Sequence, residues 1–207
     1  MIKSIFRIKK YCAVRNHTLL LNGKPEIQFP EIPFLELIEK AYNSYQINYP
    51  KFFKMDNLSK LGFVTAELLL KDLNLKENYD AYKTGIILSN KSSSLDTDVK
   101  YDAMVKKGIS SPAVFVYSLP NIVIGEISIR NGIKGENSFF ISDKYDISFQ
   151  VNYINNLLNE KVMDACICGR VELMGENYES FLYLVENNPD ENYLPHTVNN
   201  VESIYNN

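Results

Sequence analysis

Side chains that could perform chemistry are few in this chain, and their spacing gives little support for a metal or redox site. The three cysteines are Cys12, Cys166 and Cys168. A disulfide framework or a zinc site needs more partners than these. Cys166 and Cys168 are two residues apart, which predicts small hydrophobic residues on one face of a buried strand. No cofactor and no metal is predicted.

The other residues with chemical potential are two histidines and two aspartates. His17 falls near a predicted hairpin and His196 in a polar C-terminal stretch, and both are predicted to be ordinary surface histidines. Asp96 and Asp98 lie in the serine-rich stretch KSSSLDTDVKY. Such stretches are usually solvated turns, so a loop is predicted here and not a set of metal ligands.

Hydrophobic periodicity predicts the elements that must position any site. Apolar residues at helical spacing predict a helix over 34–45 and another in the segment MDNLSKLGFVTAELLLKDLNL, the second capped by Asp56 or Asn57. The segment TGIILSN predicts a short buried strand. Strands alternating with helices indicate an α/β layered domain.

The N-terminal region predicts a hairpin. Ile2, Ile5, Phe6 and Ile8 predict a first strand and the segment 18–21 a second. Asn22-Gly23 is a hairpin turn signal, and it is expected to join these two strands.

The stretch 111–146 is the part around which the chain is organised. Two apolar segments flank a turn at Pro120-Asn121, and a glycine-punctuated turn then leads to a short strand that ends before Lys144. The first apolar segment is interpreted as a buried strand. Its residues Phe115, Tyr117 and Leu119 would then share one face.

Composition narrows the function classes. A chain of 207 residues with 45% hydrophobic and 23% charged residues can bury one core. The net charge of -3 provides no basic surface for nucleic acid. Charged residues interrupt every apolar run that could serve as a signal peptide, and no run reaches the ~18 apolar residues of a membrane span. A single domain in the cytoplasm is predicted.

Four pieces of sequence carry a family resemblance in order and spacing: YPKFFKMDNLSKLGFVTAELLL, GIILSN, SPAVFVYSLPNIVIGEISIRNGIKGEN and DACICGRVELMGENYESFLYLVE. They resemble the N-terminal half of the β-ketoacyl synthases. The signature combines a Leu-Pro-Asn turn, Ser-Ile-Arg and a Lys-Gly-x-Asn turn. The resemblance implies half of a thiolase-like α/β fold, with a five-stranded mixed sheet and flanking helices. It divides the chain into a domain at 1–186 and a loosely held polar tail at 187–207.

The same resemblance implies that the family's catalytic residues are absent. In a working ketosynthase, the strand after the Lys-Gly-x-Asn turn ends in Thr-Ala-Cys, and a helix N-terminus lowers the pKa of that thiol. Counting from Asn137 without gaps places Ser142, Asp143 and Lys144 there. Lys144 is predicted to be structural or solvated, with Asp143 as its ion-pair partner. The two catalytic histidines of the family lie in its C-terminal half, and neither histidine of this chain matches them.

These departures resemble the chain-length factors of type II polyketide systems, which lack the cysteine and pair with an active ketosynthase. The nearest resemblance is to short ketosynthase-like proteins of aryl polyene, flexirubin and dialkylresorcinol pathways. It implies a non-catalytic subunit of fatty-acid or polyketide biosynthesis. The implied pairing strand consists of Ser138, Phe139, Phe140, Ile141 and Ser142, and the residues implied to line the partner's acyl tunnel are Phe115, Tyr117 and Leu119.

A partner is also expected on physical grounds. Half of a thiolase fold leaves apolar faces uncovered, and an unpaired strand containing Phe139, Phe140 and Ile141 would promote aggregation. The predicted partner is a full-length ketosynthase in a heterodimer. The alternatives are a stand-alone thioester-processing enzyme without a cysteine nucleophile, a module that binds acyl carrier protein, and a homodimer. Neither nucleic acid nor a membrane is a predicted partner.

Overall fold

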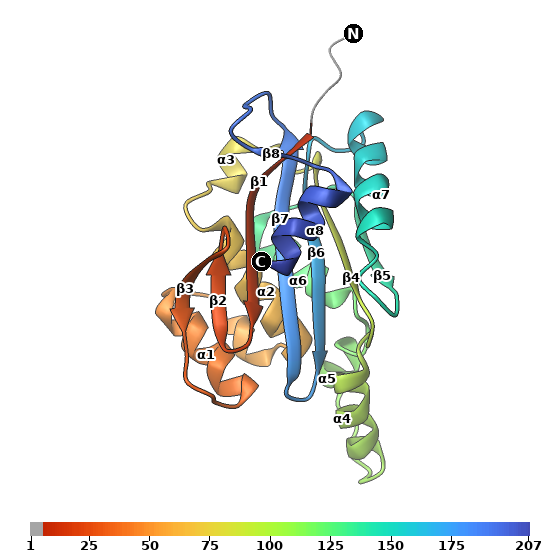
Figure 1. Cartoon of the computed structure of the whole chain (residues 1–207). Helices are drawn as coiled ribbons and strands as arrows, with labels where there is room; N and C mark the ends of the chain where they lie inside the picture. The colour runs from red at the N-terminus through yellow and green to blue at the C-terminus, as the bar shows by residue number, and fades with distance from the viewer. Residues whose placement is uncertain (1–5) are drawn as a thin grey trace.

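The computed structural model describes residues 6–207, which form one mixed sheet with helices on both faces (Figure 1). The strands are β1 (Phe6–Arg15), β2 (Thr18–Leu21), β3 (Lys24–Gln28), β4 (Thr84–Asn90), β5 (Asn137–Ile141), β6 (Ala165–Met174), β7 (Asn177–Asn187) and β8 (Leu194–Pro195). The helices are α1 (Phe34–Ser44), the 3-10 helix η1 (Pro50–Lys54), α2 (Asn57–Leu70), α3 (Leu75–Asn78), α4 (Leu95–Val105), α5 (Pro112–Val116), α6 (Ile122–Asn131), α7 (Ile147–Asn159) and α8 (Val198–Asn206).

Within the described residues the sheet has eight strands in the order β3-β2-β1-β7-β6-β4-β5, with β8 beside β1. β4 runs parallel to β5 and β6, and the other pairs are antiparallel. The predicted α/β class with a mixed sheet is confirmed. The strand count exceeds the predicted five because the β2–β3 hairpin and β8 add strands beyond β1, β7, β6, β4 and β5.

Two tight turns explain the additional N-terminal strands. Asn16 and His17 have positive φ angles of 48° and 58°, and Asn22 and Gly23 have 49° and 74°. Positive φ at both central residues is the geometry of a two-residue hairpin turn. The first turn joins β1 to β2 and the second joins β2 to β3, so the prediction that Asn22-Gly23 joins the first two strands is wrong. Ile2 and Ile5 lie outside the described residues.

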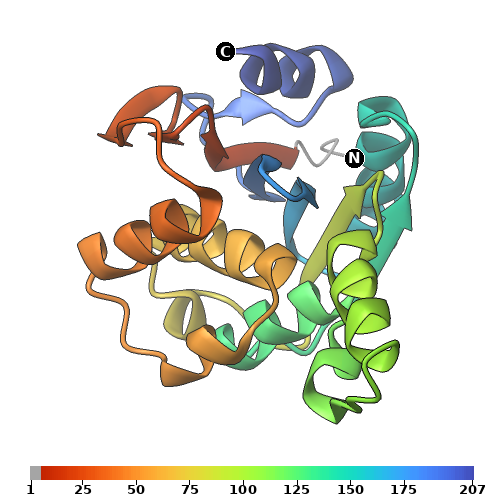
Figure 2. The same ribbon diagram turned by 90° about the horizontal axis from the view of Figure 1, so that it is seen from below.

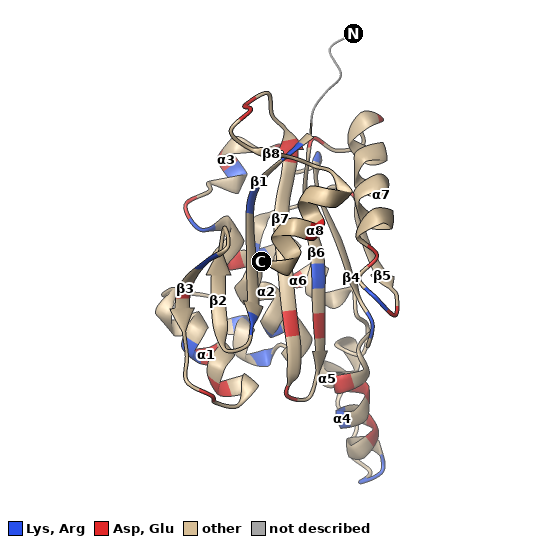
Figure 3. Ribbon diagram, in the orientation of Figure 1, with Lys and Arg blue, Asp and Glu red and all other residues tan. Residues whose placement is uncertain are grey.

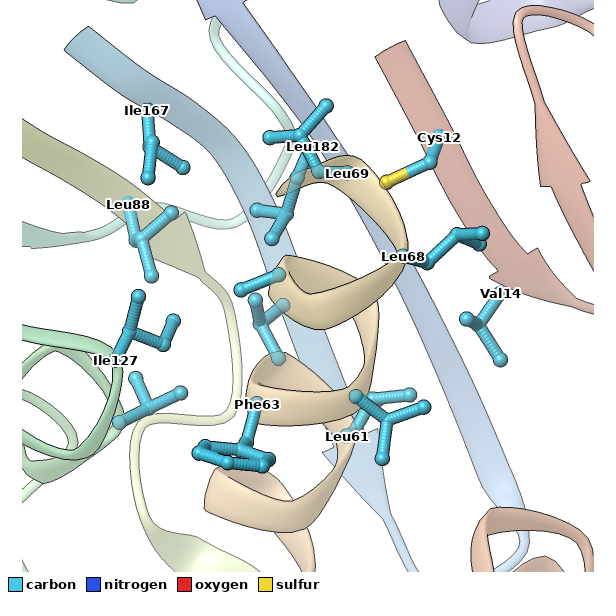
Figure 4. Close-up of a cluster of buried hydrophobic side chains, with 14 of the residues drawn as sticks. Cys12, Val14, Leu61, Phe63, Leu68, Leu69, Leu88, Ile127, Ile167 and Leu182 are labelled. Carbon is cyan, nitrogen blue, oxygen red and sulfur yellow. The ribbon is translucent and has the colours of Figure 1, made fainter. Parts of the chain in front are cut away.

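Helix α2 is the centre of the first core. It begins at a side-chain cap, because Asp56 accepts the backbone N–H of Ser59 at 3.0 Å. Leu61, Phe63, Leu68 and Leu69 project from it toward side chains of β1, β4, β6, β7 and α6 (Figure 4). The helix predicted over 34–45, the helix predicted in the segment 55–75 and the strand TGIILSN are therefore confirmed.

The opposite face of the sheet carries a second core beneath α7 and α8, and Figure 2 shows these helices across the sheet from α1 and α2. Cys166 and Cys168 are buried on this face, as predicted from their spacing. Val201 and Ile204 of α8 are buried against the same face. The expectation of an uncovered apolar sheet face is therefore wrong for the middle of the sheet.

The C-terminal segment is not loosely held, which corrects the prediction for residues 187–207. β8 pairs with β1, and the side chain of Thr197 caps α8 by accepting the N–H of Asn200. His196 is buried and not on the surface, and its backbone N–H donates to Phe6 at 2.8 Å. The apolar residues of α8, which are Val198, Val201, Ile204 and Tyr205, stand in an asparagine-rich stretch whose polar composition concealed their helical spacing.

The segment 111–119 is also not a strand. The side chain of Ser111 accepts the N–H of Val114, and Pro112 occupies the first helical position, which together begin α5. In a helix, Phe115 and Tyr117 point in different directions. Tyr117 is buried, whereas Phe115 and Leu119 are exposed.

The serine-rich stretch forms a helix as well. Asp96 and Asp98 lie in the first turn of α4, where acidic residues complement the helix dipole, and not in a solvated loop. Asp96 is buried and accepts the backbone N–H of Gly175 at 3.0 Å. Within residues 6–207, no helix is long and apolar enough to cross a membrane.

Candidate functional site

Among residues 6–207, β5 forms one edge of the sheet and has backbone groups without a partner strand. The C=O of Glu136 accepts an N–H of β4 at 2.9 Å, and the N–H of Ser142 donates to β4 at 2.9 Å. Backbone groups of alternate residues in a strand point to the same side. The N–H and C=O groups of Asn137, Phe139 and Ile141 therefore point away from β4. This edge can receive another strand.

The two edges of the sheet differ in how they are protected. At the β3 edge, Lys24, Pro25 and Glu26 are all exposed. Charged residues and proline prevent strand addition. β5 has neither, and it is drawn entirely in tan in Figure 3. Of the two edges, only β5 is open to pairing.

Some side chains of β5 pack against the cores of the molecule, and others are exposed to solvent. Phe139 packs against the first core, and Phe140 packs edge-to-face on Phe149 and Tyr153 of α7, with centroid separations of 4.9 and 5.3 Å. Ile141 is 51% exposed and Phe149 is 44% exposed. These two side chains offer apolar surface beside the free backbone edge.

The position predicted from the sequence to correspond to the ketosynthase nucleophile lies in the loop after β5. Lys144 is exposed there and precedes α7, whose first turn is capped by the carboxylate of Asp146. Asp143 pairs with Lys91 at 2.6 Å, and this hydrogen bond lowers the pKa of Asp143 and raises that of Lys91. The predicted pairing of Asp143 with Lys144 is wrong. No thiol stands at this helix N-terminus.

A pocket of about 230 Å³ opens beside this loop. Its lining residues are Ser89, Phe140, Ile141, Ser142, Asp146, Phe149 and Gln150.

Gln150 is buried, its amide nitrogen donates to Gly169 at 3.0 Å, and its oxygen accepts the hydroxyl of Tyr145 at 2.6 Å. Sequence reasoning missed Gln150, although it shares the apolar face of α7 with Ile147, Val151 and Ile154. Its polar groups hold the loop and the sheet together.

Residues 94–119, here called the arm, extend past the end of the sheet on the side of β4 and β5 (Figure 1). The arm contains α4 and α5. Its exposed apolar side chains are Leu95, Val99, Val105, Ile109, Phe115, Val116 and Leu119, each 47–58% exposed. Exposed apolar side chains are frequent in this segment, which makes it a candidate interaction surface.

Comparisons with known proteins were made for the sequence and for the fold. No family model matches the sequence, and no curated protein matches it. A structure described as the ishigamide ketosynthase/chain length factor has a TM-score of 0.69 at 16% identity, covering 92% of this chain and 64% of that chain. The chain has the fold of ketosynthases and chain length factors.

Two further structures with this ketosynthase-like fold are complexes. One is the ketosynthase ApeO in complex with its chain length factor ApeC from Xenorhabdus doucetiae, with a TM-score of 0.57 at 12% identity over 90% of this chain and 80% of that chain. The other is AntDE:AntF, a type II polyketide synthase acyl-carrier protein with its ketosynthase, with a TM-score of 0.62 at 17% identity over 89% and 64%. This chain thus spans less than two thirds of the ishigamide and AntDE:AntF chains that it matches.

Proposed function

We propose that this chain is a non-catalytic, chain-length-factor-like subunit that pairs with an active β-ketoacyl-acyl carrier protein synthase in fatty-acid or polyketide-type biosynthesis, such as that of polyene pigments. The observation that carries the proposal is β5, an uncharged edge strand with free backbone groups. It borders an apolar arm in a fold shared with ketosynthases and their chain length factors. The three cysteines, all buried and unpaired, favour a reducing compartment such as the cytoplasm.

Co-expression with a full-length ketosynthase from the same genome tests the proposal. The two chains are expected to co-purify as a heterodimer, with β5 and the arm protected from hydrogen exchange. A homodimer through β5 and a complex with acyl carrier protein alone are the competing results. If the chain remains a monomer and never co-purifies with the ketosynthase, the proposal is wrong.

The isolated chain is expected to have no acyl-transfer activity. Lys144 is exposed to solvent and offers an amine, not the thiolate that accepts the acyl group in a working ketosynthase. Incubation with an acyl thioester should leave the intact mass unchanged, and Lys144→Cys should not restore condensation. One acyl group per chain on Lys144 would instead favour the stand-alone enzyme.

Phe115→Ala is expected to change the length of the partner's products while the melting temperature stays nearly constant. Phe115 is 58% exposed on the arm, so its truncation removes little buried surface. Phe53→Ala, at a phenylalanine that is 54% exposed outside the arm, is the matched control. Product length and melting temperature should be measured on the same complexes. Unchanged products from both Phe115→Ala and Leu119→Ala would remove the arm from chain-length control.

A further inference from the structure

The arm has almost no hydrophobic attachment to the rest of the molecule. No residue between 98 and 116 is buried, although most of α4, all of α5 and their connection fall in this range. Its main internal apolar contact is between the rings of Tyr101 and Phe115, 5.6 Å apart. Segments with few buried apolar contacts open readily unless other interactions hold them.

Polar contacts hold the arm at its beginning. The hydroxyl of Thr97 donates to Asp56 at 2.7 Å, which ties α4 to the start of α2. Asp96 accepts the backbone N–H of Gly175 at 3.0 Å, which ties α4 to the β6–β7 turn. Thr97 and Asp96 are both buried. These contacts form the first anchor.

A second anchor holds the end of the arm. The buried hydroxyl of Tyr117 donates to Glu126 of α6 at 2.8 Å. The same carboxylate oxygen contacts the ammonium of Lys51 at 2.9 Å, and Glu126 itself is buried. The hydroxyl of Ser94 also donates to the C=O of Ser118 at 2.8 Å, which closes the two ends of the arm on one another.

We infer that Thr97 and Tyr117 are positioning residues that fix the direction of the arm before the partner binds. This inference rests on the proposed function, because the partner is the ketosynthase that pairs with β5. The arm begins four residues after β4 ends, and the Lys91–Asp143 ion pair joins that connection to the end of β5. An arm held in one direction therefore forms a single continuous surface with the β5 edge of the sheet. Holding the arm in that direction before binding reduces the conformational entropy that the chain loses when the ketosynthase binds.

The test removes each anchoring hydroxyl and keeps the shape of the side chain, in Thr97→Val, Tyr117→Phe and the double variant. Tyr205→Phe is the matched control for tyrosine, because its hydroxyl donates to Glu179 at 2.8 Å outside the arm. Thr65→Val is the control for threonine, because its buried hydroxyl donates to Leu61 at 2.7 Å. Hydrogen exchange is measured on each free chain, and affinity is measured with the co-expressed ketosynthase.

In the double variant, amides 98–116 should exchange about tenfold faster or more, and the dissociation constant should rise about tenfold. The controls should change neither quantity. If the wild-type chain does not bind the ketosynthase, the proposed function fails. If it binds and the variants bind equally well with unchanged exchange in the arm, this inference alone is overturned. The single variants decide the result if the double variant folds poorly.

Discussion

Replacing Ile141 by aspartate is expected to abolish co-purification with the ketosynthase while the chain itself stays folded. Ile141 is about half exposed, and its backbone groups point to the free edge of β5. A partner strand would bury the new carboxylate without a counter-ion. Such a charge costs about 3 kcal/mol or more, which weakens binding by at least about a hundredfold.

The control is chosen to separate loss of the partner from loss of the fold. Ile129→Asp introduces the same charge at an isoleucine of α6 that is 65% exposed, and it should leave the complex intact. Phe140→Asp is a poorer test because Phe140 packs on Phe149 and Tyr153, so the fold would suffer as well. A complex of unchanged elution volume and affinity with Ile141→Asp would place the interface elsewhere.

Lowering the pH from about 6.5 towards 4 is expected to reduce the free energy of unfolding by about 1.4 kcal/mol per pH unit. Burial lowers the pKa of His196 to about 3. Its ring nitrogens contact the hydroxyl of Tyr183 at 3.2 Å and the side-chain oxygen of Asn155 at 2.7 Å. Below pH 6.5 the unfolded chain gains a proton on this histidine that the folded chain does not bind until about pH 3. Stability is therefore lost as the pH falls through that window.

Denaturant titrations of the wild type and of His196→Gln at several pH values measure this effect. The variant should show a shallower dependence on pH between 6.5 and 4, and His17→Asn should keep the slope of the wild type. The raised pKa of Asp56, which burial causes, acts in the opposite direction at the acidic end of the window. Equal slopes for the wild type and His196→Gln would show that protonation of His196 does not control acid stability.

Elements with a dominant local pattern could be predicted from the sequence. The apolar stripe of α1, the Asp56 cap of α2 and the shared face of the two cysteines of β6 all follow from spacing within one element. α5 could not be predicted in this way, because Val-Phe-Val favours a strand, whereas Ser111 and Pro112 begin a helix.

Contacts between distant segments explain most of what the sequence did not reveal. Tyr117 meets Glu126 because α5 folds back onto α6, and His196 is buried because β8 pairs with β1. In the candidate site, the sequence resemblance correctly located β5 as a short strand, but its position at the sheet edge follows from the order of all eight strands in residues 6–207. The use of β5 in pairing remains a prediction.

The unequal protection of the two sheet edges limits how large an assembly can become. A sheet that is extended through β5 ends, on this chain's far side, at Lys24, Pro25 and Glu26 of β3. These residues disfavour a further strand there, so an assembly formed through β5 would close after one partner has joined. A chain with two bare edges could add a neighbour at each and grow into a filament. These few residues of β3 would thus keep the assembly finite.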